Sequence, residues 1–150
     1  MLRTHNPVAP QELDADPWLL NVANGTVDLR TGELRPHDRR DRLTHMVPHA
    51  YDPAAKCPAF ECAISEMMDG RRELVAYLQR WLGYCLTGET REDAIALFIG
   101  RGKNGKSVVL DVISSVVGDD LSCAAPESLL LMRSQREHPA ELMALKGRRF

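Results

Sequence analysis

An apolar segment followed by a glycine-rich loop constrains the fold of this chain more than any other feature. Residues 94–99, Ala-Ile-Ala-Leu-Phe-Ile, are apolar at successive positions, as in a strand that is covered on both faces within a parallel sheet. Residues 100–107 contain three glycines, and from about Lys106 to Gly118 valines and an isoleucine recur with helical spacing. This order predicts a buried strand, a tight loop and a helix, which together form the building unit of an α/β fold.

The loop sequence, Gly-Arg-Gly-Lys-Asn-Gly-Lys-Ser, matches the Walker A pattern G-x-x-x-x-G-K-[ST]. Glycine tolerates positive φ, so successive backbone N–H groups can point inward at an anion, and Asn104 tolerates the same conformation. We expect Lys106 to contact the β- and γ-phosphates of ATP and to be the catalytic residue, and Ser107 to ligate Mg²⁺. The predicted nucleotide-binding residues are Gly100, Arg101, Gly102, Lys103, Asn104, Gly105, Lys106, Ser107 and Val108. The alternative is a glycine-rich turn that binds nothing.

The region before residue 87 reads as a small α+β unit. Short apolar runs alternate with the turn dipeptides Asn24-Gly25 and Thr31-Gly32, which predicts a β-meander from Trp18 to Arg35, with a type I′ turn at Asn24-Gly25. A further short strand is indicated around residues 43–47. Residues 1–17 are polar, contain three prolines and lack periodicity, so we interpret them as a flexible arm or linker.

Four further helices are predicted, two of them from helical spacing. Apolar residues fall on one face from Phe60 to Met68, before Gly70, and on one face of a longer helix from Leu74 to Cys85. We interpret their methionines and aromatic residues as core packing. Two short helices are predicted near residues 126–132 and 139–146, each with a proline close to its first position.

Charge and cysteine usage narrow the class of protein. The net charge of −2 excludes a globally basic nucleic-acid binder, but a local basic patch is enough to hold a phosphate backbone. The run from Arg35 to Arg42 is either a solvated surface or a DNA contact, since Asp38 and Asp41 interrupt it. The four cysteines lack zinc-site spacing, which indicates reduced structural thiols. No apolar run in the sequence is long enough to span a membrane. We therefore expect a cytoplasmic protein.

The Gly-x-Gly-x-Asn-Gly-Lys-Ser form of the loop resembles that of superfamily 3 helicases in the phage/plasmid primase family, which are relatives of the poxvirus primase-helicase. Further blocks resemble that family's region preceding the motor and its segment just before the Walker B strand: residues 20–34, 51–53, 57–58 and 81–88, then residues 138–142 and 145–149. The blocks occur in the family's order, so the resemblance covers about residues 18–150.

The resemblance implies an AAA+-like P-loop NTPase fold with a partial parallel sheet, preceded by a small α+β region with a β-meander and two helices. After the arm at residues 1–17, it implies a helicase N-terminal region at 18–86 and the first part of the P-loop domain at 87–150, truncated before the Walker B strand. The implied protein is an ATP- and Mg²⁺-dependent DNA helicase of phage, plasmid or prophage replication. It would assemble as a homo-hexamer on single-stranded or forked DNA. No DNA-binding residues are assigned.

Residues 18–150 depart from the family pattern at their C-terminal end. The Walker B acids, the polar sensor and the arginine finger do not occur among them. No carboxylate after residue 94 follows a hydrophobic strand that would let it substitute; the candidates are Asp111, Asp119, Asp120, Glu127 and Glu141. We therefore expect weak nucleotide binding, little turnover and no primer synthesis from this chain alone. Two alternatives stay open: a P-loop NTPase or kinase unrelated to helicases, and a non-catalytic replication or assembly module with a relic loop.

Overall fold

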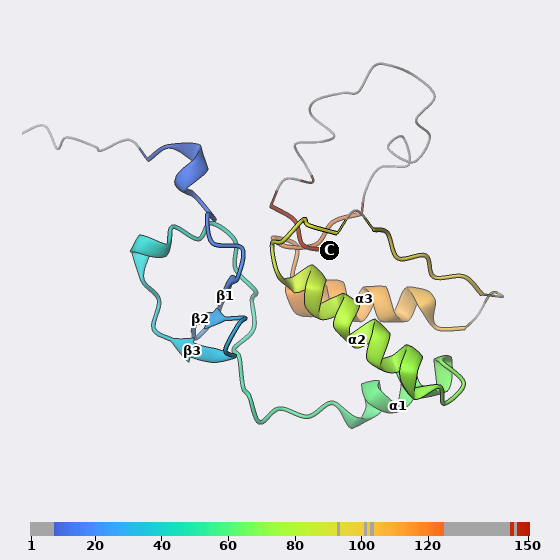
Figure 1. Ribbon diagram of the computed structural model, residues 1–150. Coiled ribbons are helices and arrows are strands. Elements are labelled where there is room, and N and C mark those ends of the chain that lie inside the picture. Colours follow the sequence, from blue (N-terminus) through green and yellow to red (C-terminus); the bar gives the residue numbers. More distant parts are fainter. Residues whose placement is uncertain (1–7, 93, 101, 103, 125–144, 146) are drawn as a thin grey trace, which may run out of the picture.

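The computed structural model describes residues 8–92, 94–100, 102, 104–124, 145 and 147–150, and shows a small α+β arrangement in this part of the chain (Figure 1). Its strands are β1 (Leu19–Val22), β2 (Gly25–Asp28) and β3 (Glu33–Arg35), and its α-helices are α1 (Pro58–Met67), α2 (Arg72–Leu86) and α3 (Lys106–Val117). Two short 3-10 helices, η1 (Pro10–Glu12) and η2 (Arg39–Asp41), flank the sheet in sequence. The helix predicted at 126–132, and all but the end of the one predicted at 139–146, lie outside the described residues.

The predicted β-meander is confirmed. The sheet has the order β1-β2-β3, and both pairs are antiparallel, with Leu20 opposite Val27 and Val27 opposite Leu34. The strand predicted around residues 43–47 is reduced to one parallel bridge, in which the Val47 N–H donates to the carbonyl of Asn21 at 2.9 Å. The meander therefore forms the sheet of the described region, and Val47 extends it by a single contact.

The type I′ turn predicted at Asn24-Gly25 is wrong. Val22 pairs with Gly25, so Ala23 and Asn24 form the two-residue loop, and neither has a positive φ. The Asn24 amide instead fixes Tyr51 by accepting from its N–H at 2.9 Å and donating to its carbonyl at 3.0 Å. Gly25 is required for a different reason: a Cβ there would lie 2.4 Å from the carbonyl oxygen of Arg35.

The helix predictions between residues 58 and 118 are confirmed. The two predicted upstream helices correspond to α1 and α2, and the helix predicted after the loop begins at Lys106. Gly118, at a φ of 79°, ends α3, because glycine adopts this conformation without a Cβ penalty.

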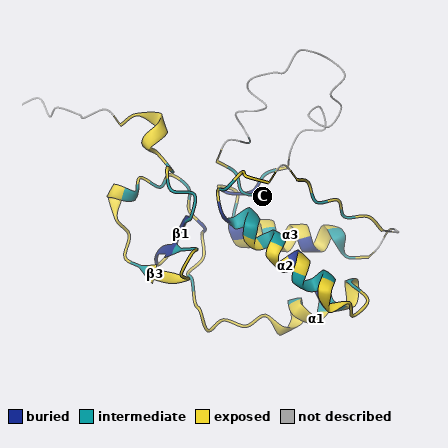
Figure 2. Cartoon of the chain, in the orientation of Figure 1, coloured by how far each residue is buried: buried dark blue, intermediate teal, exposed yellow. Residues whose placement is uncertain are grey.

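Two apolar clusters hold these elements together, and α3 contributes to both (Figure 2). Val117 at the end of α3 joins the cluster over the meander, whose buried residues are Leu20, Val22, Val27, Val47, Val117 and Leu121. Val109 near the start of α3 joins Ile64 of α1 and Leu78 of α2. Each cluster therefore combines residues from before and after residue 87. The division into an arm and two domains stays a prediction, although Pro17 accepts a hydrogen bond from the Gly88 N–H at 2.7 Å.

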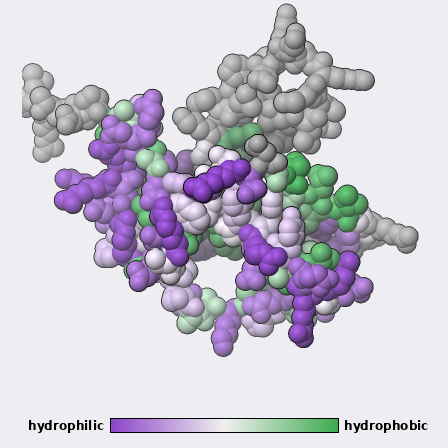
Figure 3. Space-filling view, viewed as in Figure 1, coloured by the Kyte–Doolittle hydropathy of each residue, from purple (hydrophilic) through white to green (hydrophobic). Residues whose placement is uncertain are grey.

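The buried strand predicted at residues 94–99 is not formed, and this expectation is corrected. The segment is extended without strand pairing, and the side chains of Ile95, Leu97 and Ile99 are 72%, 72% and 89% exposed. Apolar surface gathers on this side of the molecule (Figure 3, green, at the right). A buried strand needs neighbouring strands for its N–H and C=O groups and cover on both faces. No described residue pairs with this segment, so the parallel P-loop sheet is absent from the described part of the chain.

Candidate functional site

The glycine-rich loop connects the extended segment at 94–99 to the first turn of α3. Gly105 precedes the helix at φ 80° and ψ 0°, and its carbonyl accepts the helical hydrogen bond from the Val109 N–H at 3.0 Å. No side chain caps the N-terminus of α3. The first N–H groups of a helix carry a partial positive charge, so the N-terminus of α3, where the loop ends, favours an anion.

Three of the predicted site residues come together in this loop. The Lys106 ammonium donates to the carbonyl of Gly100 at 3.3 Å and to the side-chain oxygen of Asn104. A Cβ at Gly100 would lie 2.2 Å from Nδ2 of Asn104 and 3.5 Å from Nζ of Lys106, so a larger residue there would displace the Asn104 side chain. Two oxygen atoms of the loop therefore hold the Lys106 ammonium close to Gly100, the first residue of the loop.

The remaining predicted residues are placed less closely. Gly102 is described and exposed, and Ser107 and Val108 are exposed in the first turn of α3. Arg101 and Lys103 lie outside the described residues. The structure thus gathers Gly100, Asn104 and Lys106, and it leaves the Ser107 hydroxyl at the surface beside them.

The last residue of α1, Met67, lies against the glycine-rich loop, and the sequence pattern did not predict this contact. A Cβ placed on Gly105 would lie 2.3 Å from Cε and 2.9 Å from Sδ of Met67, the last residue of α1. The helical spacing predicts core packing for the methionines of this helix, but Met67 is exposed and lies against the loop. No sequence signal links two positions so far apart in the chain.

A pocket of about 400 Å³ extends from the loop along α2. The extended segment at 94–99 and helices α1 and α2 supply most of its apolar lining. Among the described residues, Arg71 and Lys106 are the charged residues of its lining, and none of the described carboxylates lines it. The arrangement offers positive charge at the loop and apolar surface beyond it, which suits an anionic ligand with an apolar part.

The loop fits a magnesium nucleotide better than an independent metal ion. Within the described ranges no group of three or more His, Cys, Asp or Glu side chains could hold a metal. Magnesium in nucleotide sites usually keeps several waters and is held by phosphate oxygens with only one or two protein ligands. A single exposed hydroxyl, that of Ser107, is consistent with such a site.

Several arginines away from the loop form contacts within the protein. Arg35 pairs with Asp41 at 2.8 Å, a hydrogen bond that raises the pKa of Arg35, and Arg42 pairs with Glu12. Arg149 donates to the carbonyl of Leu19 at 3.0 Å and to that of Leu86, and burial lowers the pKa of its guanidinium. Arg149 therefore joins β1 to the C-terminal end of α2. Whether the Arg35 to Arg42 run contacts DNA stays open.

The four cysteines are only in part the structural thiols that the sequence predicts. All four cysteines carry free thiols, but Cys57 and Cys62 are exposed rather than structural core residues. Each of these two thiols lies 3.6 Å from the carboxylate four residues later, a spacing that places both groups on one side of α1.

None of the helices in the described part of the chain has the length and apolar character needed to cross a membrane.

Comparison with known proteins gives a family match at the N-terminal end and distant relatives along most of the chain. Residues 1–69 match the family model described as "D5 N terminal like". Two similar proteins, from the Malawi tick and Namibia warthog isolates of African swine fever virus, each bear the name "Putative primase C962R". Each is 28% identical over 149 residues, covering 93% of this chain. The chain spans 15% of the length of these relatives. These matches support a relationship between this chain and D5-like, primase-related proteins.

Proposed function

We propose that this chain carries the nucleotide-binding loop, and the region preceding it, of an ATP-dependent DNA helicase of the superfamily 3 primase-helicase type. The observation that carries the proposal is the position of Lys106, which the carbonyl of Gly100 and the side chain of Asn104 hold over a loop that ends at a left-handed Gly105. The family match at residues 1–69 supports it, as do relatives whose 93% coverage of the chain necessarily includes the loop.

The residues of the loop have separate roles in this proposal. Lys106 would exchange its contacts with Gly100 and Asn104 for phosphate oxygens, and the N–H groups at the start of α3 would add hydrogen bonds to the same anion. Ser107 would hold Mg²⁺ through its exposed hydroxyl. Magnesium ATP supplies the phosphoanhydride bond whose cleavage drives a helicase.

Binding and turnover are proposed to differ in this chain. Asp111, Asp119 and Asp120 are exposed, and no carboxylate of the described ranges lines the pocket that contains Lys106. Hydrolysis needs a group that orients the attacking water and further charge stabilisation, and an arginine finger by itself is worth about 10³–10⁵ in rate. We therefore propose that the chain binds nucleotide but hydrolyses it slowly.

The wider context is part of the same proposal and is supported by the resemblance of the loop and its flanking blocks. It comprises a role in replication of phage, plasmid or prophage DNA, single-stranded or forked DNA as partner, a homo-hexameric ring and a cytoplasmic location. The name primase belongs to relatives of which this chain spans 15%, and we do not propose primer synthesis for these residues.

Equilibrium titration with a fluorescent ATP analogue and Mg²⁺ tests the proposal. Lys106→Ala should raise Kd about tenfold or more, since a hydrogen bond to a charged group contributes about 1.5–3 kcal/mol. Lys56→Ala is the matched control, because Lys56 is an exposed lysine that does not line the pocket. Equal Kd values for the two variants would contradict the proposal.

A further inference from the structure

The corner between α1 and α2 is a fixed turn that lies against the glycine-rich loop. Asp69 and Gly70 are both left-handed, at φ 54° and 68°, and the Gly70 N–H donates to the carbonyl of Ser65 at 2.9 Å. The Arg71 N–H closes the turn on the carbonyl of Met68 at 3.1 Å. Met67, which lies next to this corner, packs its side chain against Gly105, so the corner and the loop are neighbours.

Arg71 projects from this corner and is oriented by its own turn. Its Nε donates to the carbonyl of Met68 at 3.3 Å, and this leaves its two terminal nitrogens available to a ligand. In the described part of the chain no carboxylate forms an ion pair with it, whereas Arg35 and Arg42 each have one. An exposed guanidinium with one nitrogen fixed and its fork open is suited to bidentate contact with a phosphate.

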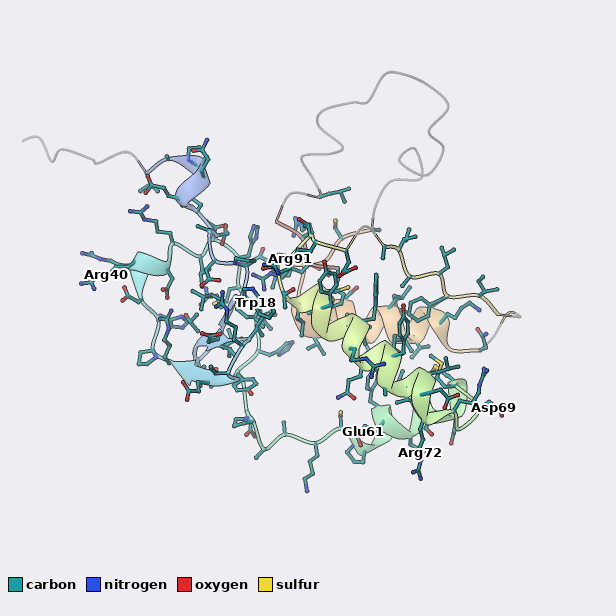
Figure 4. All side chains as sticks on the ribbon, in the orientation of Figure 1. Trp18, Arg40, Glu61, Asp69, Arg72 and Arg91 are labelled. Carbon is teal, nitrogen blue, oxygen red and sulfur yellow. The ribbon has the colours of Figure 1, made fainter. Side chains whose placement is uncertain are left out.

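Arg71 also shares the pocket with Lys106 and Asn104. Of the residues that the structure describes, the cations in this lining come from two parts of the chain: Lys106 begins α3, and Arg71 lies in the turn between α1 and α2. Arg72, the next residue, is exposed but does not line the pocket, and Figure 4 shows it on the side of the corner away from α3.

We propose that Arg71 is a second phosphate-binding residue of the nucleotide site, so that the α1–α2 unit forms one wall of this site. A nucleoside triphosphate would extend its phosphates between Lys106 and Arg71. The inference rests on the proposed nucleotide binding at Lys106. It also assigns a ligand-binding role to helices that could otherwise serve only to dock a partner.

The test compares five versions of the full chain, namely wild type, Lys106→Ala, Arg71→Gln, Arg71→Lys and Arg72→Gln, titrated with a fluorescent ATP analogue and Mg²⁺. Arg71→Gln should raise Kd about tenfold, while Arg72→Gln should stay within about twofold of wild type. The effect of Arg71→Gln should vanish for a fluorescent adenosine analogue without phosphates, which a merely structural role would not explain. Circular dichroism identifies any variant that fails to fold, and Arg71→Lys, which keeps the charge, should recover part of the affinity.

The outcomes separate this inference from the proposal beneath it. If Lys106→Ala weakens binding but Arg71→Gln behaves like Arg72→Gln, the role of Arg71 is overturned and the nucleotide site stands. If Lys106→Ala leaves Kd unchanged, the nucleotide site itself is overturned, and the role of Arg71 falls with it.

Discussion

Gly105 joins the loop to α3, and replacing it by alanine tests how the loop is built. At φ 80° a residue with a Cβ costs roughly 1–2 kcal/mol relative to glycine. The new Cβ would also meet the Met67 methyl group at 2.3 Å. Met67 is flexible and exposed, so its methyl can move, and losing that contact adds at most about 0.8 kcal/mol, the value of one buried methylene. Gly105→Ala should therefore destabilise the chain by about 1–3 kcal/mol.

Urea unfolding followed by far-UV circular dichroism measures this change. Gly83→Ala is the matched control, because Gly83 lies inside α2 with nothing within 4 Å of its Cβ position, and it should gain roughly 0.5–1 kcal/mol. In a Met67→Ala background the cost of Gly105→Ala should fall to the backbone part alone. A Gly105→Ala protein as stable as Gly83→Ala would refute both the left-handed conformation and the contact with Met67.

Two further predictions concern contacts outside the loop. Arg149→Ala should lower the free energy of unfolding, measured in urea, by about 2–5 kcal/mol, because two carbonyls in β1 and α2 lose their charged donor. The control Arg39→Ala, at an exposed site, should change it by less than about 0.5 kcal/mol. For Asp16, burial would raise the pKa, but hydrogen bonds from the Trp18 N–H and from Arg30 outweigh it and the pKa is lowered from 3.8. A lowered folded-state pKa gives stability that is present above the unfolded pKa and lost as pH falls through the folded one. Thermal unfolding should therefore show a larger acid loss of Tm below about pH 4 in wild type than in Asp16→Asn, and parallel Tm curves would contradict this.

The elements that sequence reasoning placed correctly are those with local signals. The bounds of α3 follow from apolar residues at helical spacing and from Gly118, whose positive φ at the helix end favours glycine. The meander follows from short apolar runs between turn residues. The closeness of Gly100, Asn104 and Lys106 is likewise encoded within eight residues of chain.

The features that it missed depend on partners distant in sequence. The dipeptide Asn24-Gly25 predicts a type I′ turn, but the hairpin loop is Ala23-Asn24 without positive φ, and the Asn24 amide bonds to Tyr51, which no local pattern indicates. The burial of residues 94–99 was inferred from their composition, yet burial requires neighbouring strands, and the described residues provide none. The contact of Met67 with Gly105 and the position of Arg71 beside Lys106 arise only when the chain folds.

The most direct test of the central claim follows the backbone N–H signals of the ¹⁵N-labelled chain in two-dimensional NMR spectra as magnesium ATP is added. If the loop binds the phosphates, the largest shifts should fall on residues 100–107 and on the first turn of α3. The same shifts should be absent when adenosine replaces ATP. Shifts that are no larger in the loop than in the β-meander would contradict a nucleotide site at Lys106.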